Sequence, residues 1–219
     1  MNDELPAAAP VHTPPPQHEM PKHHNEHRSG LKNIASTLAI LIIAPLVALL
    51  ITSFLFQSYE VFGPSMESTL HDGDRLIVVK APRTWAKIRN KTFMPMRGQI
   101  VVFTKLDLFL AGEHGGNKQL IKRVIGLPGE RIVVKEGVLT VYNKEHPDGY
   151  QPDKEQAYGK VIQKTGIDVD VTVGDDEVFV CGDNRDNSLD SRTFGPIKTK
   201  DIVGTAAFRF LPTNQARSL

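Results

Sequence analysis

Cysteine is nearly absent from the 219 residues, and Cys181 is the only one. The chain therefore forms no intrachain disulfide, and a domain of this length can bury a core without one. Cys181 directly follows the apolar run Val178–Val180, so we expect its side chain to pack as a small hydrophobe. The sequence does not indicate a catalytic thiol.

Net charge and metal-binding patterns are also scarce. The formal net charge is +1, which gives no reason to expect nucleic acid or a strongly acidic partner. Beyond residue 30 only His71, His114 and His146 remain, and none forms a pair at the spacing of metal ligands. We therefore expect no metal and no nucleic acid.

Residues 1–32 lack the apolar side chains that would offset the entropy lost when a chain becomes ordered. They are rich in proline and histidine, with Pro14–Pro16 near the centre and five of the eight histidines of the chain. The pair His23 and His24 leaves a metal site open, but a solvated tail is the simpler interpretation. We expect residues 1–32 to be a disordered tail.

Charge is missing altogether from Ile34 to Tyr59, where aliphatic residues and phenylalanine dominate. About 20 such residues cross a bilayer as a helix, so we expect one transmembrane helix over residues 33–58. Pro45 lies inside it, where membrane helices tolerate a local kink. The run is longer than that of a cleaved signal peptide and ends in aromatic residues typical of a membrane interface. These features predict an uncleaved signal anchor.

The charges on either side of this helix predict its orientation. Lys22, Arg28 and Lys32 precede it, whereas the first charged residues after it are Glu60 and Glu67. Positively charged flanks stay in the cytoplasm, so we expect a cytoplasmic tail and an extracytoplasmic domain over residues 59–219. The protein would cross the cytoplasmic membrane once and contact its lipid.

The rest of the chain has the pattern of a β domain. Short runs of β-branched residues are bounded by glycine, proline and charged residues. They cover residues 75–80, 99–103, 131–135, 138–142, 177–181 and 202–210. Glu136–Gly137 predicts a tight hairpin, and only residues 83–89 show a short helical period. We expect a mostly β domain of antiparallel sheets, barrel-like or a sandwich, with a loop at 108–119 and a variable insertion at about 143–174.

Two side chains could form a catalytic pair. Ser65 lies in the turn-prone stretch Phe62–Leu70, but a serine hydroxyl is inert until a base activates it. Lys122 lies between the apolar pairs Leu120–Ile121 and Val124–Ile125, and burial of its amine would favour the neutral form. A neutral amine can take the hydroxyl proton, which is the logic of a Ser-Lys dyad. Taken alone, the two residues are better explained as a serine in a turn and a solvated lysine at a strand edge.

Other groups are less well supported as bases. His71 is near Ser65, and His114 and His146 lie in expected loops, but no neighbouring carboxylate is placed to orient an imidazole. The stretch Gly182–Arg192 is rich in turn-forming and oppositely charged side chains directly after a strand. An exposed turn explains that composition, and so does a loop locked against the dyad.

Taken in order, these motifs resemble those of bacterial type I signal peptidases, or leader peptidases, a family of Ser-Lys serine proteases. The matching residues are Ser65-Met66, Thr69-Leu70, Gly73-Asp74, Lys122-Arg123, Gly126-Leu127-Pro128-Gly129 and Gly182–Arg192. The likeness extends from Tyr59 to about Phe210, and the single anchor and Gly63 are similar to the short bacterial forms. One departure is Ser68, where the family commonly has proline; it loosens a turn but removes no catalytic group.

The resemblance implies a membrane-bound endopeptidase that removes N-terminal signal peptides from exported preproteins and needs no cofactor. Ser65 would be the nucleophile and would offer its backbone amide to the oxyanion, and Lys122 would be the general base. Ser188 would hydrogen-bond and orient the Lys122 amine. Asp190 and Arg192 would brace the Ser188 loop as an ion pair.

The resemblance also implies how the peptide is bound. Small apolar pockets would select alanine-like side chains at substrate positions −1 and −3, an Ala-x-Ala pattern. Residues that resemble the pocket-lining positions are Val61, Met66, Leu70, Leu120 and Ile121. Some relatives carry a hydroxyl at the position of Gly63, which here would offer only its backbone to the oxyanion.

Two other functions remain open at this level. A related Ser-Lys protease dedicated to one pilin, conjugation protein or secreted substrate would carry the same motifs. A non-catalytic, membrane-tethered β module that binds peptides would share the anchor and the fold.

Overall fold

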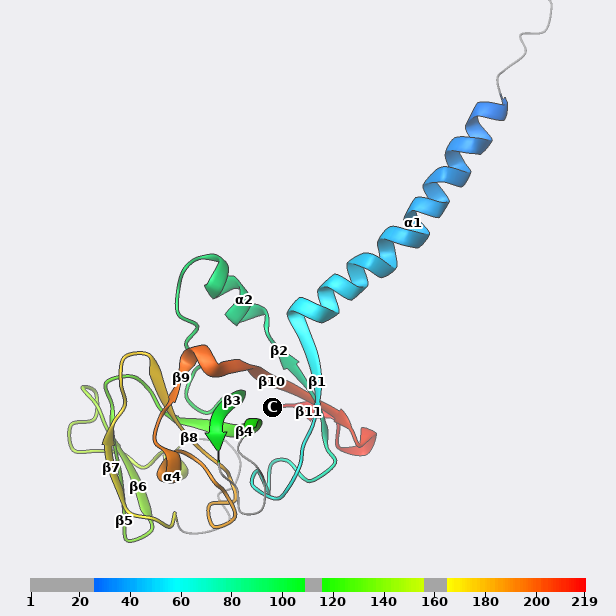
Figure 1. The fold of residues 1–219 in the computed structure, drawn as a ribbon. Coiled ribbons are helices and arrows are strands. Elements are labelled where there is room, and N and C mark those ends of the chain that lie inside the picture. The colour runs from blue at the N-terminus through cyan, green and yellow to red at the C-terminus, as the bar shows by residue number, and fades with distance from the viewer. Residues whose placement is uncertain (1–25, 109–115, 156–164) are drawn as a thin grey trace, which may run out of the picture. The chain divides into compact units, whose positions relative to one another are not determined.

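The structure, a computed structural model, describes residues 26–108, 116–155 and 165–219 (Figure 1). Helix α1 covers Glu26–Leu55 and contains Pro45. From Ser36 to Leu55 it is long and apolar enough to cross a membrane, and none of that stretch is buried in the protein. Two units, Met1–Pro45 and Leu46–Leu219, divide at this proline.

The observed ends of this helix differ from the expected ones. α1 begins at Glu26, inside the expected tail of residues 1–32, and it ends at Leu55 rather than at 58. Strand β1, Phe56–Glu60, follows at once because its backbone pairs with β2, where Glu60 also lies 3.4 Å from Arg75. The first strand of the β domain thus begins before the expected boundary at 59, and residues 1–25 lie outside the described part.

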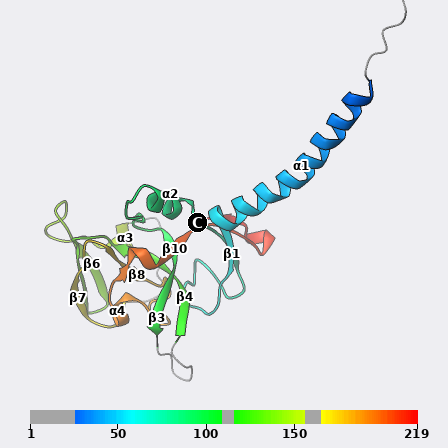
Figure 2. The same cartoon turned by 45° about the horizontal axis from the view of Figure 1, so that its top comes forward.

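Eight of the described strands form one large antiparallel sheet in the order β1-β2-β10-β3-β4-β8-β9, with β11 paired to β10. Three more form a second antiparallel sheet in the order β6-β5-β7. In Figures 1 and 2 the second sheet lies at the side of the large sheet that is opposite β1. The mostly β, antiparallel fold expected from the sequence is confirmed.

The remaining elements follow from the chain in order. The strands are β2 Arg75–Val79, β3 Ile100–Leu108, β4 Gly116–Gly126, β5 Arg131–Lys135, β6 Val138–Tyr142, β7 Val169–Thr172, β8 Glu177–Cys181, β9 Ile197–Lys198, β10 Ile202–Leu211 and β11 Arg217–Ser218. The helices are α2 Ala81–Ile88, α3 Pro152–Glu155 and α4 Ser191–Phe194, with 3-10 turns at Thr199–Asp201 and Thr213–Gln215.

The hairpin expected at Glu136–Gly137 is present. β5 and β6 pair up to Lys135 opposite Val138, which leaves a two-residue turn. The φ angles in the turn are 53° and 81°, and this turn type needs positive values at both central positions. Glycine adopts such an angle without steric cost, which explains Gly137.

The prediction of a loop over residues 108–119 is wrong at both ends, because strands occupy part of that range. Leu108 is the last residue of β3, and β4 begins at Gly116. Pairing of Lys105 with Lys118 and of Thr104 with Gln119 extends the two strands, since ladder hydrogen bonds stabilise a polar, glycine-containing segment that strand propensity disfavours. Residues 109–115 lie outside the described part, as do residues 156–164 of the insertion expected at 143–174.

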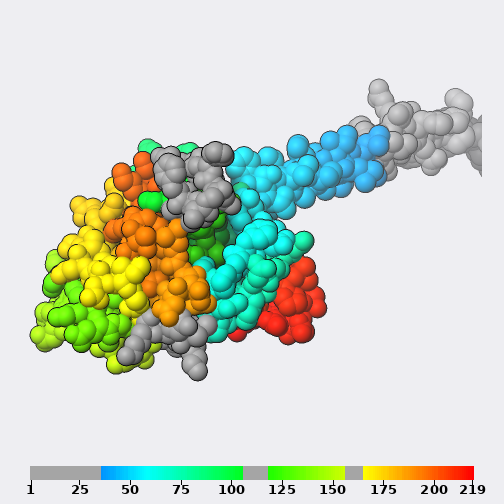
Figure 3. All heavy atoms as spheres, turned by 60° about the horizontal axis from the view of Figure 1, so that its bottom comes forward, coloured from blue at the N-terminus to red at the C-terminus, as the bar shows by residue number. Residues whose placement is uncertain are grey.

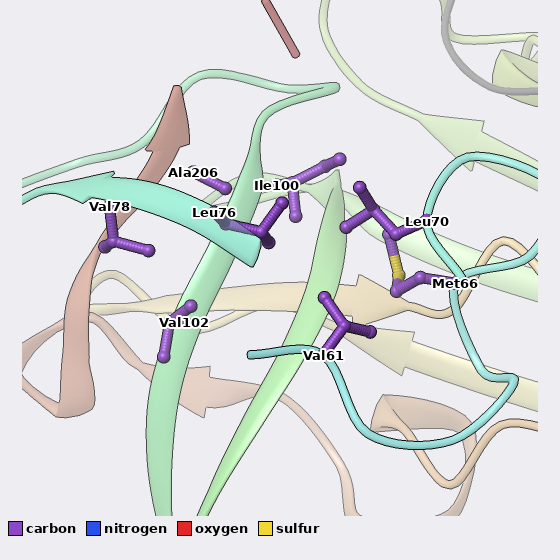
Figure 4. Close-up of a cluster of buried hydrophobic side chains, with 8 residues drawn as sticks. All are labelled: Val61, Met66, Leu70, Leu76, Val78, Ile100, Val102 and Ala206. Carbon is purple, nitrogen blue, oxygen red and sulfur yellow. The ribbon is translucent and has the colours of Figure 1, made fainter. Parts of the chain in front are cut away.

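Three buried apolar clusters hold the sheets together. The first core, drawn in Figure 4, packs the segment after β1 onto the large sheet. It consists of Val61, Met66, Leu70, Leu76, Val78, Ile100, Val102 and Ala206. A second cluster joins Ile125, Phe179 and Cys181 of the large sheet to residues of the second sheet. Cys181 is fully buried there, as the sequence predicts.

Candidate active site

Ser65 lies in the turn that connects β1 to β2, above the first core. Its neighbours Met66 and Leu70 are fully buried and point toward the large sheet in Figure 4. The N–H groups of Thr69 and Leu70 both donate to the Met66 carbonyl, at 2.8 and 2.9 Å. These contacts fix the turn against the first core, while Ser65 itself stays half-buried.

The Lys122 amine meets the Ser65 hydroxyl. Lys122 is in β4, and its Nζ lies 2.7 Å from Ser65 Oγ and 2.9 Å from the carbonyl oxygen of Ile121. Val101 of β3 is paired with Lys122, and Cys181 of β8 is paired with the next residue, so the amine rises from the interior of the sheet. The two residues that the sequence singled out are in hydrogen-bond contact.

Burial changes the protonation of this amine. Lys122 is only 3% exposed, and its burial lowers the pKa of the amine from 10.5 to about 8. The negative charge of Asp190 opposes this effect, and Arg192 adds to it. At neutral pH a measurable fraction of the amine is therefore neutral and able to accept a proton.

The next residue of β4 faces a different buried site. Arg123 Nε donates to Asp183 Oδ1 at 2.8 Å and its Nη2 to Asp183 Oδ2 at 2.6 Å. The Thr69 hydroxyl donates to the same carboxylate at 2.6 Å, and the Asn184 N–H donates to the Ser65 carbonyl at 3.1 Å. These contacts fasten the stretch after β8 to the turn that holds the nucleophile candidate; Figure 3 shows this turn in turquoise beside the orange stretch.

Asp190 and Arg192 form the ion pair that the resemblance implies. Arg192 Nη2 lies 2.8 Å from Asp190 Oδ2, and Nε lies 2.8 Å from Oδ1. Asp190 also caps α4 by accepting from the Arg192 N–H, and it accepts from the Gly182 N–H at 2.9 Å. Arg192 reaches the carbonyl of Arg185 at 2.6 Å. The ion pair therefore holds the beginning and the end of the Gly182–Arg192 stretch together.

Ser188 is the exception among the expected contacts. Its hydroxyl is buried, and it has no hydrogen-bond partner in the described part of the chain. The hydrogen bond to Lys122 that the resemblance implies is absent from this structure, where the amine instead takes the Ile121 carbonyl as its second partner. Turn chemistry in the sequence predicts the loop but does not fix the rotation of one hydroxyl.

Gly182 sits where the loop and the turn approach most closely. A Cβ added there would clash with the Ser65 carbonyl oxygen and with the Ser188 side chain. Gly182→Ala is therefore expected to lower the free energy of unfolding by about 1–3 kcal/mol. The added Cβ would push the Ser65 backbone away and strain the hydrogen bond from the Asn184 N–H to the Ser65 carbonyl. Chemical denaturation measures this change. Gly166→Ala is the matched control, since its Cβ meets only one atom at ordinary contact, and an equal loss in both variants would contradict the close approach.

A cavity of about 240 Å³ opens beside the hydroxyl. Of the expected pocket residues, Val61, Leu120 and Ile121 line it. Met66 and Leu70 do not, because both are fully buried in the first core. Strand alternation does not apply within a turn, so their apolar character predicted burial but not its direction. Further lining residues that the sequence did not single out are Tyr59, Leu76, Val102, Gln119 and Leu189.

The backbone N–H of Gly63 already has a hydrogen-bond acceptor within the protein. Its N–H donates to Asp72 Oδ1 at 2.6 Å, so the backbone donation expected from this position is directed away from a substrate. Its φ angle is +79°, which L side chains rarely adopt. The Ser65 N–H, in contrast, donates to no group in the described part of the chain.

Histidine and metal chemistry find no support near Ser65. His71 is exposed and uses its backbone N–H to bind Asp74, while His146 stacks on Tyr150 with ring centroids 4.6 Å apart. Among the residues whose side chains are described, no three His, Cys, Asp or Glu side chains form a group that could hold a metal ion. His114 lies outside the described residues.

The residues that the sequence missed at this site share a feature. Arg123, Asp183 and Thr69 all stand inside motifs that were recognised, but each was given no role of its own. Their partners are 54 to 114 positions away along the chain, so no local pattern reveals the pairing. The only local indication of this contact was the position of Asp183, an acidic residue that follows a strand and stands next to Gly182.

Comparison with known proteins gives consistent matches. A family model described as "Signal peptidase, peptidase S26" matches residues 34–211. Signal peptidase I of Bacillus licheniformis is 37% identical over 179 residues, which cover 81% of this chain and 88% of that protein. Signal peptidase I of Bacillus amyloliquefaciens is 36% identical over 198 residues, covering 90% and 98%. The crystal structure of a signal peptidase I from Enterococcus faecalis V583 matches with a TM-score of 0.37 and 26% identity, over 51% of this chain and 96% of that one.

Proposed function

Because the chain belongs to the signal peptidase family, peptidase S26, and is thus a serine endopeptidase that removes signal peptides, we propose that Ser65 is its nucleophile and Lys122 its general base. The observation that carries this proposal is the 2.7 Å contact between Lys122 Nζ and Ser65 Oγ. The amine in this contact has a pKa lowered to about 8 by burial.

Acylation begins when neutral Lys122 takes the hydroxyl proton as Ser65 Oγ attacks the carbonyl of the scissile peptide bond. The Ser65 N–H donates to the oxyanion that develops. The Gly63 N–H does not contribute, since Asp72 holds it. The Lys122 ammonium then protonates the leaving amine. The mature protein departs, and the signal peptide stays as an ester on Ser65.

Hydrolysis of the ester repeats the proton transfers with water. Lys122 takes a proton from the attacking water and returns it to Ser65 Oγ as the signal peptide leaves. The Ile121 carbonyl, 2.9 Å from Nζ, steadies the amine through both steps. We assign Ser188 as a further partner of the amine during turnover, because a buried hydroxyl without a partner is unfavourable. Asp190 and Arg192 hold its loop in place.

The cavity beside Ser65 suits apolar side chains of the substrate. Its volume of about 240 Å³ is bounded by apolar atoms of Val61, Leu76 and Ile121 among others. The resemblance to signal peptidases implies alanine-like residues at positions −1 and −3 of the substrate, and their methyl groups fit within this apolar space. We therefore propose cleavage after an Ala-x-Ala pattern in exported preproteins.

Attachment of the enzyme and the preprotein to the same membrane would bring them together. α1 is long and apolar enough to span a bilayer, and the basic residues before it favour a cytoplasmic N-terminus. We propose that residues from about 59 onward work at the extracytoplasmic face. Confinement to one surface raises the effective concentration of the signal peptide near Ser65.

The rate of cleavage is expected to depend on pH through Lys122. For a preprotein with an Ala-x-Ala site, kcat/KM should rise about tenfold per pH unit at acidic pH and level off above about pH 8, because only the neutral amine accepts the proton. The test uses the full-length protein in detergent micelles, with initial rates and sequencing of the new N-terminus. A preprotein with large residues at −1 and −3 is the control and should not be cut.

Two outcomes would overturn parts of this proposal. A flat pH profile, with the chemical step shown to limit the rate, would remove Lys122 as the base. Cleavage of one preprotein only, out of a panel of unrelated ones, would replace general processing with a dedicated role.

A further inference from the structure

Helix α2 exposes apolar side chains that the fold does not use. None of its residues is buried, and Trp85 and Ile88 are 55% and 69% exposed. Residues three apart on a helix lie on the same face, so the two side chains form one apolar strip. Tryptophan combines an apolar ring with a polar N–H and is favoured where hydrocarbon meets headgroups.

Hydrogen bonds hold α2 against the end of the membrane-spanning stretch. The Lys80 N–H donates to the Leu55 carbonyl at 2.8 Å, and Lys80 Nζ donates to the Ser53 carbonyl at 2.9 Å. The Thr84 hydroxyl lies 3.4 Å from the carbonyl of Phe54, whose ring is itself exposed. Figures 1 and 2 show α2 beside the point where α1 passes into β1. α2 is therefore held beside Ser53–Leu55, the end of the stretch that is long and apolar enough to cross a membrane.

The charges around this strip have one sign. Between Asp74 and Asp107 the chain carries eight lysine or arginine residues and no acidic residue, although its total net charge is only +1. Lys87, Arg89 and Lys91 are exposed, and in the part of the chain with described side chains no acidic group pairs with them. Arg89 lies over the Trp85 ring, 5.6 Å from its centroid.

We propose that α2 and the residues up to Lys91 form a second membrane contact, which binds anionic phospholipid. Trp85 and Ile88 enter the headgroup region, and Lys87, Arg89 and Lys91 contact lipid phosphates, as in interfacial amphipathic helices. The contact ties the catalytic unit to the surface beside the anchor, so that Ser65 keeps a set height above the bilayer. The inference requires that α1 spans the membrane, and it is independent of the Ser65–Lys122 assignment.

The chain supplies its own probe for this contact, because Trp85 is its only tryptophan. Full-length protein is incorporated into nanodiscs of phosphatidylcholine alone, or of phosphatidylcholine with phosphatidylglycerol, and disc-bound protein is isolated by size exclusion. Trp85 emission and its quenching by lipids brominated near the headgroup are then measured. In anionic discs we expect a shift to shorter wavelength and strong quenching, both reversed at about 1 M salt, where the Debye length falls to about 3 Å.

Two charge-matched variants identify the residues responsible. Lys87→Gln/Arg89→Gln/Lys91→Gln should weaken docking by about fivefold for each cation that contacts the surface, and so return Trp85 to its emission in neutral discs. Lys135→Gln/Lys144→Gln/Lys154→Gln removes three exposed lysines elsewhere and should behave as wild type. Cleavage of a preprotein in detergent should be unchanged in both, which shows that they fold.

The outcomes separate the alternatives. Equal quenching in neutral and anionic discs, or equal loss in both variants, overturns recognition of anionic lipid. Absence of quenching in every disc overturns docking itself and leaves α2 as a surface for a protein partner. Neither result affects the proposed catalytic residues, which are tested by cleavage alone.

Discussion

A Lys122→Met variant is expected to lose preprotein cleavage and yet to be more stable than the wild-type protein at pH 7. Methionine is of similar length and apolar, and the site that receives it is 3% exposed. The wild-type pKa falls from 10.5 to about 8 on folding, which corresponds to roughly 3 kcal/mol of unfavourable free energy for the charged amine. Loss of the contacts to Ser65 and Ile121 offsets about 1 kcal/mol of the gain.

The stability gain should itself depend on pH. Below about pH 8 the amine is protonated in both the folded and the unfolded protein, so the fold bears the full cost of burying the charge. Between about 8 and 10.5 the unfolded chain binds more protons than the folded one, so wild-type stability rises with pH. Above 10.5 the amine is neutral in both states, and this part of the difference between wild type and variant disappears.

Chemical denaturation of the full-length proteins in the same detergent, at several pH values, measures this difference. Lys135→Met is the matched control, because Lys135 is exposed at the end of β5 and its loss should change neither stability nor cleavage. A Lys122→Met protein that is less stable at pH 7 would show that the buried amine supports the fold, contrary to the cause assigned to its lowered pKa.

Replacement of Ser65 by alanine is expected to reduce kcat/KM by on the order of 10⁴-fold or more. The variant keeps the turn, since Met66 and Leu70 rather than Ser65 fill the first core, and its stability should change by no more than about 1 kcal/mol. The measurement is the initial rate of preprotein cleavage, with folding checked by circular dichroism.

The double variant Ser65→Ala/Lys122→Met gives the sharper test. Two residues that act as one catalytic unit lose their effect together, so the double variant should be no slower than the worse single variant. Multiplication of the two losses would mean that the residues act in separate steps. A Ser65→Ala protein with substantial remaining activity would assign the nucleophile to another group.

Local sequence patterns were sufficient to predict much of the fold of this protein. Positive φ angles at Glu136 and Gly137, the buried Cys181 and the apolar length of α1 all depend on residues close together in the sequence. The meeting of Ser65 with Lys122 spans 57 positions. It was predicted because an apolar setting for a lysine and the order of the motifs both pointed to it.

The features that sequence could not provide depend on packing between distant segments. An apolar residue in a turn can line a cavity or enter a core, and Met66 and Leu70 entered the core because β2 and β3 offer them Leu76 and Ile100. Gly63 was expected to offer its N–H to the oxyanion, but Asp72 turns back across the loop and takes it. The β1 strand was hidden because Phe56–Glu60 continues the apolar and aromatic end of the anchor.

The solitary cysteine has a practical consequence for work on this molecule. Cys181 has no exposed surface, and burial raises the pKa of its thiol. Maleimides and spin-label reagents react with accessible thiolates, so the natural chain should remain unlabelled in its folded state. A cysteine placed at Ile88 would then carry a single probe without removal of a native residue. The same property means that inactivation by a thiol reagent would indicate unfolding or a contaminating protease, not modification of this site.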